Sequence, residues 1–197
     1  MSSIGDQRLP RVHVYGHVSA QPKAIAEIFS AEHVNEPIPE SDLAIFAINP
    51  SAGIDQATIE LWATLSEFQL PRLVVVNELD GSDSDFDDGV LLANRVLDQL
   101  VTPYLVLHSD SGDPTALIDL QSLEIIDYST IPTTRRDSDS EHKELVAEFR
   151  EEFLESVEDA GEDAFEAGLL FPAIPMVITK GIGIDIVKSF IERVVKN

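Results

Sequence analysis

Two polar residues separated by two positions, Asn77 and Asp80, have the types and the spacing to bind a purine base. They follow the apolar run Leu73–Val76, which has the composition of a buried strand in a parallel sheet. Open α/β sheets bind ligands at the carboxyl ends of such strands. There the Asp80 carboxylate would accept both donors of the Watson–Crick edge of guanine, and the Asn77 amide would brace the loop and reach the purine. Asn and Asp are also common in ordinary turns, so a structural turn stays open as an alternative.

A second candidate segment, Gly16 to Lys23, stands where a phosphate-binding loop would lie, between an expected strand and an expected helix. Such a loop needs glycines that let backbone N–H groups surround the phosphate, a lysine for charge, and a Ser or Thr for Mg²⁺. Gly16 is in place, but no glycine in the chain is followed directly by lysine. Pro22 also removes an N–H donor from the start of the helix. The sequence therefore predicts that this segment is not a working phosphate cradle.

The other candidate sites favour structural interpretations. The acidic run Asp80–Asp88 spaces some carboxylates as a calcium loop does, but the required glycine and the final carboxylate are out of place, which predicts a solvated acidic loop. His108, Ser109 and Asp110 are consecutive, and consecutive strand residues point to opposite faces, so they do not form a catalytic triad. We therefore predict no metal site and no catalytic residues.

Alternating strands and helices must position these residues. Each expected helix carries apolar residues at helical spacing, and the expected strands are continuous or alternating apolar runs. Such alternation indicates a mostly parallel sheet with helices on its faces. The strands are expected at Arg11–Tyr15, Asp42–Ile48, Leu73–Val76 and Ala173–Ile178, and helices at Pro22–Phe29, Ile59–Phe68, Phe86–Leu100 and Ile184–Val195.

The pattern changes between the third helix and the last strand. Short strands with polar turns indicate an antiparallel patch, followed by a polar loop at Thr130–Ser140 and a long acidic helix at Asp139–Ala160. We expect one domain over residues 1–197, with a core at about 11–100 and 172–197 and an inserted α+β subdomain at about 101–171. The patch strands are expected at Tyr104–Leu107, Ala116–Leu120 and Leu123–Tyr128.

The charge of the chain excludes several classes of partner. The 197 residues include 13 Lys and Arg against 36 Asp and Glu, for a net charge of −23, which argues against direct binding of nucleic acid or anionic membranes.

The sequence also bears on location and redox chemistry. No apolar run approaches the roughly 20 residues of a membrane helix. The start of the chain, Met1–Pro10, lacks the pattern of a signal peptide, so a cytoplasmic location is expected. The absence of cysteine excludes disulfides and a thiol nucleophile.

With these elements in place, the sequence resembles the G domain of bacterial elongation factor G, a translational GTPase. Gly53–Trp62 is similar to the G-V-x-x-Q-T-x-x-x-W helix of that family. Pro71–Asp80 is similar to its V-P-R strand, which ends in the base-recognition motif N-K-x-D. Gly16–Val18 matches the G-H-V that opens the first loop of translational GTPases. Further similarity lies, in order, at Leu117–Leu120, Glu141–Phe153, Ile174–Val177 and Gly183–Val195.

The resemblance implies an α/β fold of the P-loop GTPase type: a mostly parallel sheet with helices on both faces, truncated at the first-strand edge, plus a small α+β insert. It also implies that Asn77 and Asp80 are a vestigial site for the guanine base. Gly16 and Lys23 would then be the remains of the phosphate loop.

Several positions depart from the family pattern. Gln21-Pro22-Lys23 replaces Gly-Lys-Thr, and Glu78 stands in place of the lysine of N-K-x-D. His33–Ser41 is all that remains where the family places both switch regions, with their Mg²⁺-contacting Thr and D-x-x-G loop. The G-S-A of the last base-contacting loop is replaced by Thr179-Lys180-Gly181.

These losses predict a degenerate, stand-alone domain that does not hydrolyse GTP, because phosphoryl transfer depends on positioning and electrostatic stabilisation. We expect a protein-interaction module linked to translation, with no cofactor. One alternative is a weak guanine-nucleotide-binding protein or slow GTPase that uses Asn77 and Asp80 with GTP or GDP and Mg²⁺. A second alternative is an acidic decoy for a basic ribosomal or nucleic-acid-binding surface.

The missing switch segment also bears on partners. In the family it contributes two strands beside the first strand, so strand 11–15 is expected to be an open sheet edge, in keeping with its alternating pattern. An open edge can pair with a strand of another chain. We therefore predict a homodimer or a protein partner bound through strand 11–15.

Overall fold

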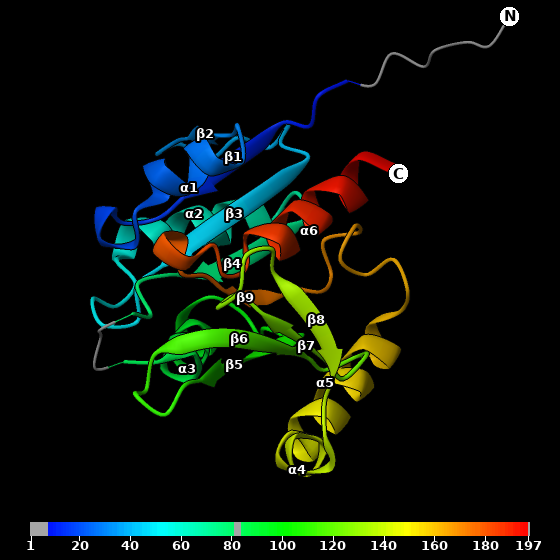
Figure 1. The fold of residues 1–197 in the computed structure, drawn as a ribbon. Coiled ribbons are helices and arrows are strands. Elements are labelled where there is room, and N and C mark those ends of the chain that lie inside the picture. Colours follow the sequence, from blue (N-terminus) through cyan, green and yellow to red (C-terminus); the bar gives the residue numbers. More distant parts are fainter. Residues whose placement is uncertain (1–7, 81–83, 197) are drawn as a thin grey trace, which may run out of the picture.

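The protein is described here by a computed structural model that covers residues 8–80 and 84–196. Two segments interpreted from the sequence lie partly outside the described residues: the start of the chain, at Met1–Gln7, and the acidic run, at Gly81–Asp83. The parallel sheet has the order β2-β1-β3-β4-β9, and every neighbouring pair runs parallel (Figure 1). The predicted mostly parallel α/β architecture is therefore confirmed. The strands are β1 (Val12–Tyr15), β2 (Glu32–His33), β3 (Leu43–Ile48), β4 (Arg72–Val76) and β9 (Ala173–Pro175).

Helices cover this sheet on both faces, with α1 and α6 in front and α2 behind in the view of Figure 1. Because both faces are covered, every residue of β3 and β4 is buried, as the continuous apolar runs in their sequences predict. None of the described helices is long and apolar enough to cross a membrane. The elements of this layer are α1 (Pro22–Ile28), α2 (Gln56–Ser66), α3 (Phe86–Val96), α6 (Ile184–Lys196) and the 3₁₀ turns η1 (Val18–Ala20) and η2 (Ile178–Lys180).

The α2 side of the core is built on aromatic contacts. The ring of Trp62 lies 4.9 Å from that of Phe46 and 5.3 Å from that of Phe171, both edge-on. The buried guanidinium of Arg72 lies 4.3 Å from the ring centres of Trp62 and Phe171 and donates to the Trp62 carbonyl. Burial lowers the pKa of Arg72 to about 10, and Asp98 opposes this shift. The Arg72 charge is thus accommodated by two aromatic faces.

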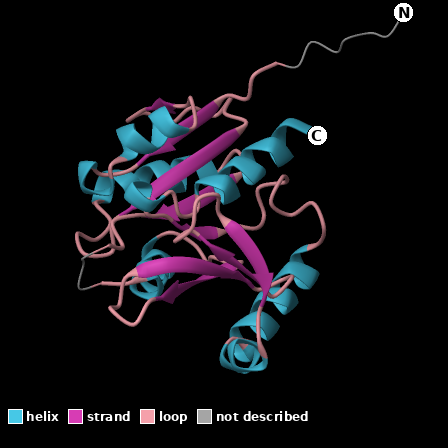
Figure 2. Cartoon of the chain, viewed as in Figure 1, coloured by secondary structure: helices cyan, strands magenta, loops and turns pink. Residues whose placement is uncertain are grey.

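The insert forms an antiparallel sheet of order β5-β6-β7-β8, as its short strands predict, with α5 packed against it and α4 at the end of α5 (Figure 1, Figure 2). Ile118, Ile125 and Phe153 belong to a second apolar cluster between this sheet and α5. Tyr128 of the insert donates to the Asp185 carboxylate of α6 at 2.6 Å, which ties the insert to the core. The elements are β5 (Tyr104–His108), β6 (Pro114–Asp119), β7 (Glu124–Asp127), β8 (Thr134–Asp137), α4 (Ser140–Leu145) and α5 (Ala147–Ala160).

Two predictions for the insert are wrong in detail. The polar segment expected as a loop contains β8, whose exposed residues pair with β7 through the backbone, and such a strand has no apolar pattern to reveal it. The long acidic helix is two helices, because the chain bends at Val146 and buries that side chain in the second cluster. Packing of one residue therefore overrides a continuous helical pattern.

The expectation that strand 11–15 forms an open edge is also wrong. After α1 the chain doubles back, and β2 pairs with β1 in parallel, with His13 opposite Glu32 and Val14 opposite His33. Val34 extends this pairing by donating its N–H to the Val14 carbonyl at 3.1 Å. A short segment of the same chain, β2, therefore occupies the place beside β1 that was expected to be open, and the reason for expecting a partner strand at β1 no longer holds.

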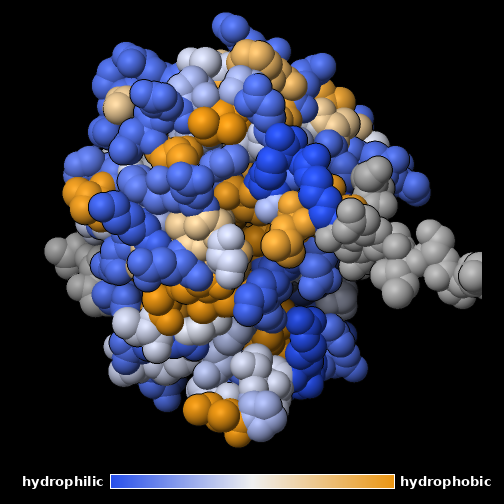
Figure 3. Space-filling model, turned by 90° about the horizontal axis from the view of Figure 1, so that it is seen from above, coloured by the Kyte–Doolittle hydropathy of each residue, from blue (hydrophilic) through white to orange (hydrophobic). Residues whose placement is uncertain are grey.

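The face of the molecule seen in Figure 3 is largely hydrophilic, with separate apolar patches.

Candidate functional site

Two asparagines define the crevice at the carboxyl ends of the parallel strands. Asn77 follows β4, is 1% exposed, and donates from its amide to the Ala20 carbonyl at 3.1 Å. Asn49 follows β3 and donates from its amide to the Ser19 carbonyl at 3.0 Å. Both amides therefore hold the η1 turn against the sheet. Sequence reasoning missed Asn49, although it follows a buried strand just as Asn77 does.

The η1 turn uses its own N–H groups. Ala20 donates to the His17 carbonyl and Gln21 to the Val18 carbonyl, both at 3.0 Å. Ser19 donates to the His17 ring nitrogen Nδ1 at 3.2 Å. A phosphate loop needs its backbone N–H groups free to point at the ligand. In this turn the N–H groups of residues 19–21 are already paired.

Gly16 serves the packing of β1 against β3. A Cβ atom at this position would lie 2.4 Å from the Ala47 carbonyl oxygen, so no other residue fits without displacing the backbone. The neighbouring depression, between η1 and the start of α2, is filled to a cavity volume of about 0 Å³. Because the turn is packed against the sheet, the space beside it does not admit a water molecule.

The position that carries lysine in the family motif is occupied here by an anchored carboxylate. Glu78, with φ of 62°, accepts a hydrogen bond from the side-chain amide of Gln21 and one at 3.4 Å from that of Asn77. Gln21 is the residue directly before α1. Lys23 lies exposed in the first turn of α1. The crevice therefore carries a fixed negative charge close to the start of the helix.

Asp80 lies at the rim of the same crevice. It is exposed, and its carboxylate accepts a hydrogen bond from the Thr179 hydroxyl at 2.9 Å. Thr179 belongs to η2, which follows β9. The structure thus brings Gly16, Asn77 and Asp80 to one end of the sheet, as their places after parallel strands predict. Among the described residues, no three His, Asp or Glu side chains lie together as a metal site would require.

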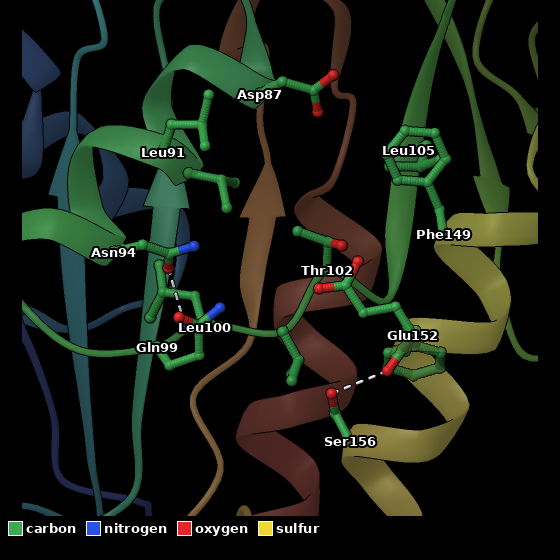
Figure 4. A pocket seen from close by; sticks show the side chains of 13 residues that line it. Asp87, Leu91, Asn94, Gln99, Leu100, Thr102, Leu105, Phe149, Glu152 and Ser156 are labelled. Atoms are coloured by element: carbon green, nitrogen blue, oxygen red, sulfur yellow. Dashed lines mark hydrogen bonds between the residues drawn. The ribbon is translucent and has the colours of Figure 1, made fainter.

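A larger hollow lies away from this crevice, between α3, β5 and α5. It encloses about 330 Å³, and Asp87 and Leu91 of α3 face Leu105 of β5 and Phe149 of α5 across it (Figure 4). A neighbouring hollow of about 160 Å³ shares Asp87, Leu105 and Phe149 with it. We call the two together the α3–β5 groove. Sequence reasoning did not identify it, because its walls come from separate parts of the chain.

Asp87 is the charged residue that both hollows of the groove share. The partial loss of solvent around its carboxyl raises its pKa, and the carboxylates of Asp85 and Asp88 raise it further, while His108 acts in the opposite direction. A cation close to the carboxyl group of Asp87 would therefore stabilise its ionised form.

Known proteins resemble this chain in sequence and in fold. An elongation factor G-like protein of Mycobacterium tuberculosis H37Rv is 26% identical over 167 residues, which cover 73% of this chain and 23% of that protein. Elongation factor G of a Ruegeria species (strain TM1040) is 26% identical over 145 residues, 70% of this chain and 20% of that protein. A crystal structure of a Thermus thermophilus protein has a TM-score of 0.68 at 23% identity, covering 78% of this chain and 26% of that one. No family model matches. The matched part of the chain spans between about a fifth and a quarter of the length of these relatives.

Proposed function

We propose that this chain, an elongation factor G-like domain by its resemblance to these relatives, binds other proteins and does not hydrolyse GTP. The observation that carries the proposal is the η1 turn, whose N–H groups at residues 19–21 pair within the turn and whose flank is filled. A nucleotide phosphate placed there would have to displace packed backbone. Without a phosphate site, a fold of this kind can still act through its surface, by binding other proteins.

The charge of the crevice supports the same function. Glu78 would repel a nucleotide phosphate, and its contact with Gln21 keeps it beside the start of α1. Catalysis of phosphoryl transfer requires positively charged groups that stabilise the phosphates. Glu78 places a negative charge near this position instead.

A second candidate function is weak binding of a guanine nucleotide through its base. The observation that favours it is the meeting of Asp80 and Thr179 at the rim, from segments that are far apart in the sequence. The exposed carboxylate of Asp80 could give up its hydrogen bond from the Thr179 hydroxyl and accept hydrogen bonds from the two donors of the guanine base. This function would need no phosphate loop.

Calorimetric titration separates the two functions. The protein with Mg²⁺ is titrated with GDP and with GTP, and ATP serves as the control for the base. We expect no heat of binding and no thermal stabilisation at millimolar nucleotide. Binding of GDP in the micromolar range that ATP does not share, and that Asp80→Ala removes, would overturn the proposal and establish the second candidate.

A further inference from the structure

The antiparallel sheet of the insert has two dissimilar edges. β8, at one edge, carries Arg135, Arg136 and Asp137, and charged side chains of this kind discourage pairing with other chains. β5, at the other edge, has the sequence Tyr-Leu-Val-Leu-His, and its apolar residues are all partly exposed. An apolar edge strand that is not fully covered is a template for an added strand.

The register of β5 shows which of its backbone groups are available. Leu120 donates to the Pro103 carbonyl at 2.9 Å, and Leu105 lies opposite Ile118 in the same ladder. Hydrogen-bonded pairs alternate in an antiparallel ladder, so Leu105 directs its N–H and C=O toward β6. Tyr104 and Val106 then direct theirs away from β6. Within residues 8–80 and 84–196, no hydrogen bond occupies these outward groups of Val106.

The outward edge of β5 opens into the α3–β5 groove. Consecutive residues Leu105–His108 line the smaller hollow, although their side chains alternate between the two faces of the sheet. The hollow must therefore run along the edge of the strand rather than over one face. Figure 4 shows α3 on one side of the adjoining hollow and β5 with α5 on the other.

We propose that the free edge of β5 binds an extended segment of a partner protein as an additional β-strand, in which apolar side chains alternate with Lys or Arg. The proposal deepens the interaction function proposed above and rests on it. Backbone hydrogen bonds to Tyr104 and Val106 would hold the segment, and the walls of the groove would select its side chains.

The two walls of the groove explain the alternation. Leu105 and Leu107 pack toward the cluster under α5, whereas Tyr104 and Val106 pack toward the main core. Side chains of an added strand alternate in the same way. On the α5 side they would meet Phe149, 46% exposed, and Leu145 of α4, 70% exposed.

On the α3 side the partner's side chains would meet Asp87, with Asp85 beside it. No Lys or Arg is present among the described residues that line the groove. A cationic side chain is therefore the complement of this wall. A second copy of this chain is a poor occupant, because it would bring another net charge of −23 to an acidic interface.

The test uses a short fluorescein-labelled peptide of alternating Val and Lys, with binding to the full chain followed by fluorescence anisotropy. Val106→Pro removes the outward N–H and leaves the ladder with β6 intact, so we expect affinity to fall by roughly fivefold. Val106→Ala, which keeps that N–H, is the matched control and should bind within about twofold of the wild type. Asp87→Asn should weaken binding by roughly threefold.

Peptide controls separate strand addition from charge attraction. A peptide of alternating Val and Glu should not bind, and the Val–Lys peptide with N-methyl groups on the amides that face β5 should lose most of its affinity. Equal binding of the N-methylated peptide, or equal binding by Val106→Pro and Val106→Ala, would overturn the proposal. Dimerisation of the protein in sedimentation experiments, abolished by the Val–Lys peptide, would assign the edge to a second copy and overturn it as well.

Amide hydrogen exchange tests the proposal on the wild-type protein, so its result does not depend on whether a variant folds. Bound peptide should slow exchange at Tyr104 and Val106 and leave that at Arg135, on the other edge of the sheet, unchanged. Unchanged exchange at Val106 would overturn strand addition. The nucleotide titration is independent of this result, so failure of the edge proposal and failure of the non-hydrolysing function are distinguishable.

Discussion

The crevice at the carboxyl ends of the parallel strands and the α3–β5 groove differ in how their polar groups are used. In the crevice, the side-chain amides of Asn49 and Asn77 donate to carbonyls of η1, and the depression between η1 and the start of α2 has a cavity volume of about 0 Å³. The groove encloses about 330 and 160 Å³ in its two hollows, and among the described residues no hydrogen bond occupies the backbone groups that Val106 directs away from β6. Motifs of the sequence point to the first region, whereas the groove, which no motif marks, is lined by partly exposed residues of β5.

The difference teaches that a residue at a motif position can have a structural role. Asn77 keeps its place because it is buried and hydrogen-bonded, which is a stability role. Leu145 and Phe149, by contrast, expose much of their apolar surface to solvent. Removing crevice residues should therefore affect folding, and removing groove residues should affect binding.

The largest effect is expected for Gly16→Ala. The added Cβ would lie 2.4 Å from the Ala47 carbonyl oxygen, and φ of 143° is unfavourable for alanine, so the free energy of unfolding should fall by about 3 kcal/mol. Urea denaturation measures this value. Gly53→Ala, at φ of 82° with no atom within 4 Å of its Cβ, is the matched control and should cost about 1 kcal/mol. Similar losses for both variants would mean that Gly16 is not held by close packing.

Asn77→Ala should be the next most damaging change. It leaves the buried Ala20 carbonyl without its donor, so we expect a loss of about 2 kcal/mol in the free energy of unfolding, measured by the same denaturation. Asp80→Ala is the control, since Asp80 is exposed, and its effect should stay below about 0.5 kcal/mol. Equal effects of the two variants would contradict a structural role for Asn77.

Glu78→Lys introduces the lysine of the N-K-x-D motif, and we expect that it does not produce nucleotide binding. The packed η1 turn remains, so calorimetry with GDP should show no heat. Because the Gln21 contact is exposed, its loss should change the free energy of unfolding by less than about 1 kcal/mol. GDP binding by this variant would show that charge alone, rather than packing, closes the crevice.

The smallest effect is expected for Asp87→Asn, and it should depend on pH. Since the pKa of Asp87 is raised in the folded protein, ionisation at neutral pH disfavours the folded state relative to the unfolded state. The variant should therefore be more stable than the wild type at pH 7. The difference should vanish as the pH falls below the ordinary value of 3.8, where both states are protonated.

Denaturation curves across this pH range test the prediction. Asp110→Asn, at an exposed position in the loop between β5 and β6, provides the same change of charge away from the groove. An equal gain in stability for the two variants would indicate a general relief of the net charge of −23 rather than an effect of the groove.

Much of the fold could be predicted from local patterns. The buried runs of β3 and β4 and the helical spacing of Ile59, Trp62 and Leu65 required no tertiary information. β8 could not be found in this way, because exposed, charged residues form a strand there only through pairing with β7. The position of β2 beside β1 was hidden for a similar reason, since a two-residue strand carries no periodicity.

The location of the candidate site could be predicted from the sequence, but the hydrogen bonds that its residues make could not. Asn77, Asp80 and Gly16 all follow parallel strands, which places them at one end of the sheet. The contact between Gln21 and Glu78, and the use of Asn49 for η1, depend on backbone conformations that residue types do not specify.

The sequence by itself determined the order of the longer strands and helices of the main sheet, the acidic charge and the resemblance to elongation factor G, because these follow from periodicity, composition and local motifs. Only the tertiary structure decided which edge is open and which crevice is filled. Edges and cavities are set by which segments, distant in sequence, pack side by side. That is why β2 could cover β1, while β5 is the edge strand of its sheet in the part of the chain that the structure describes.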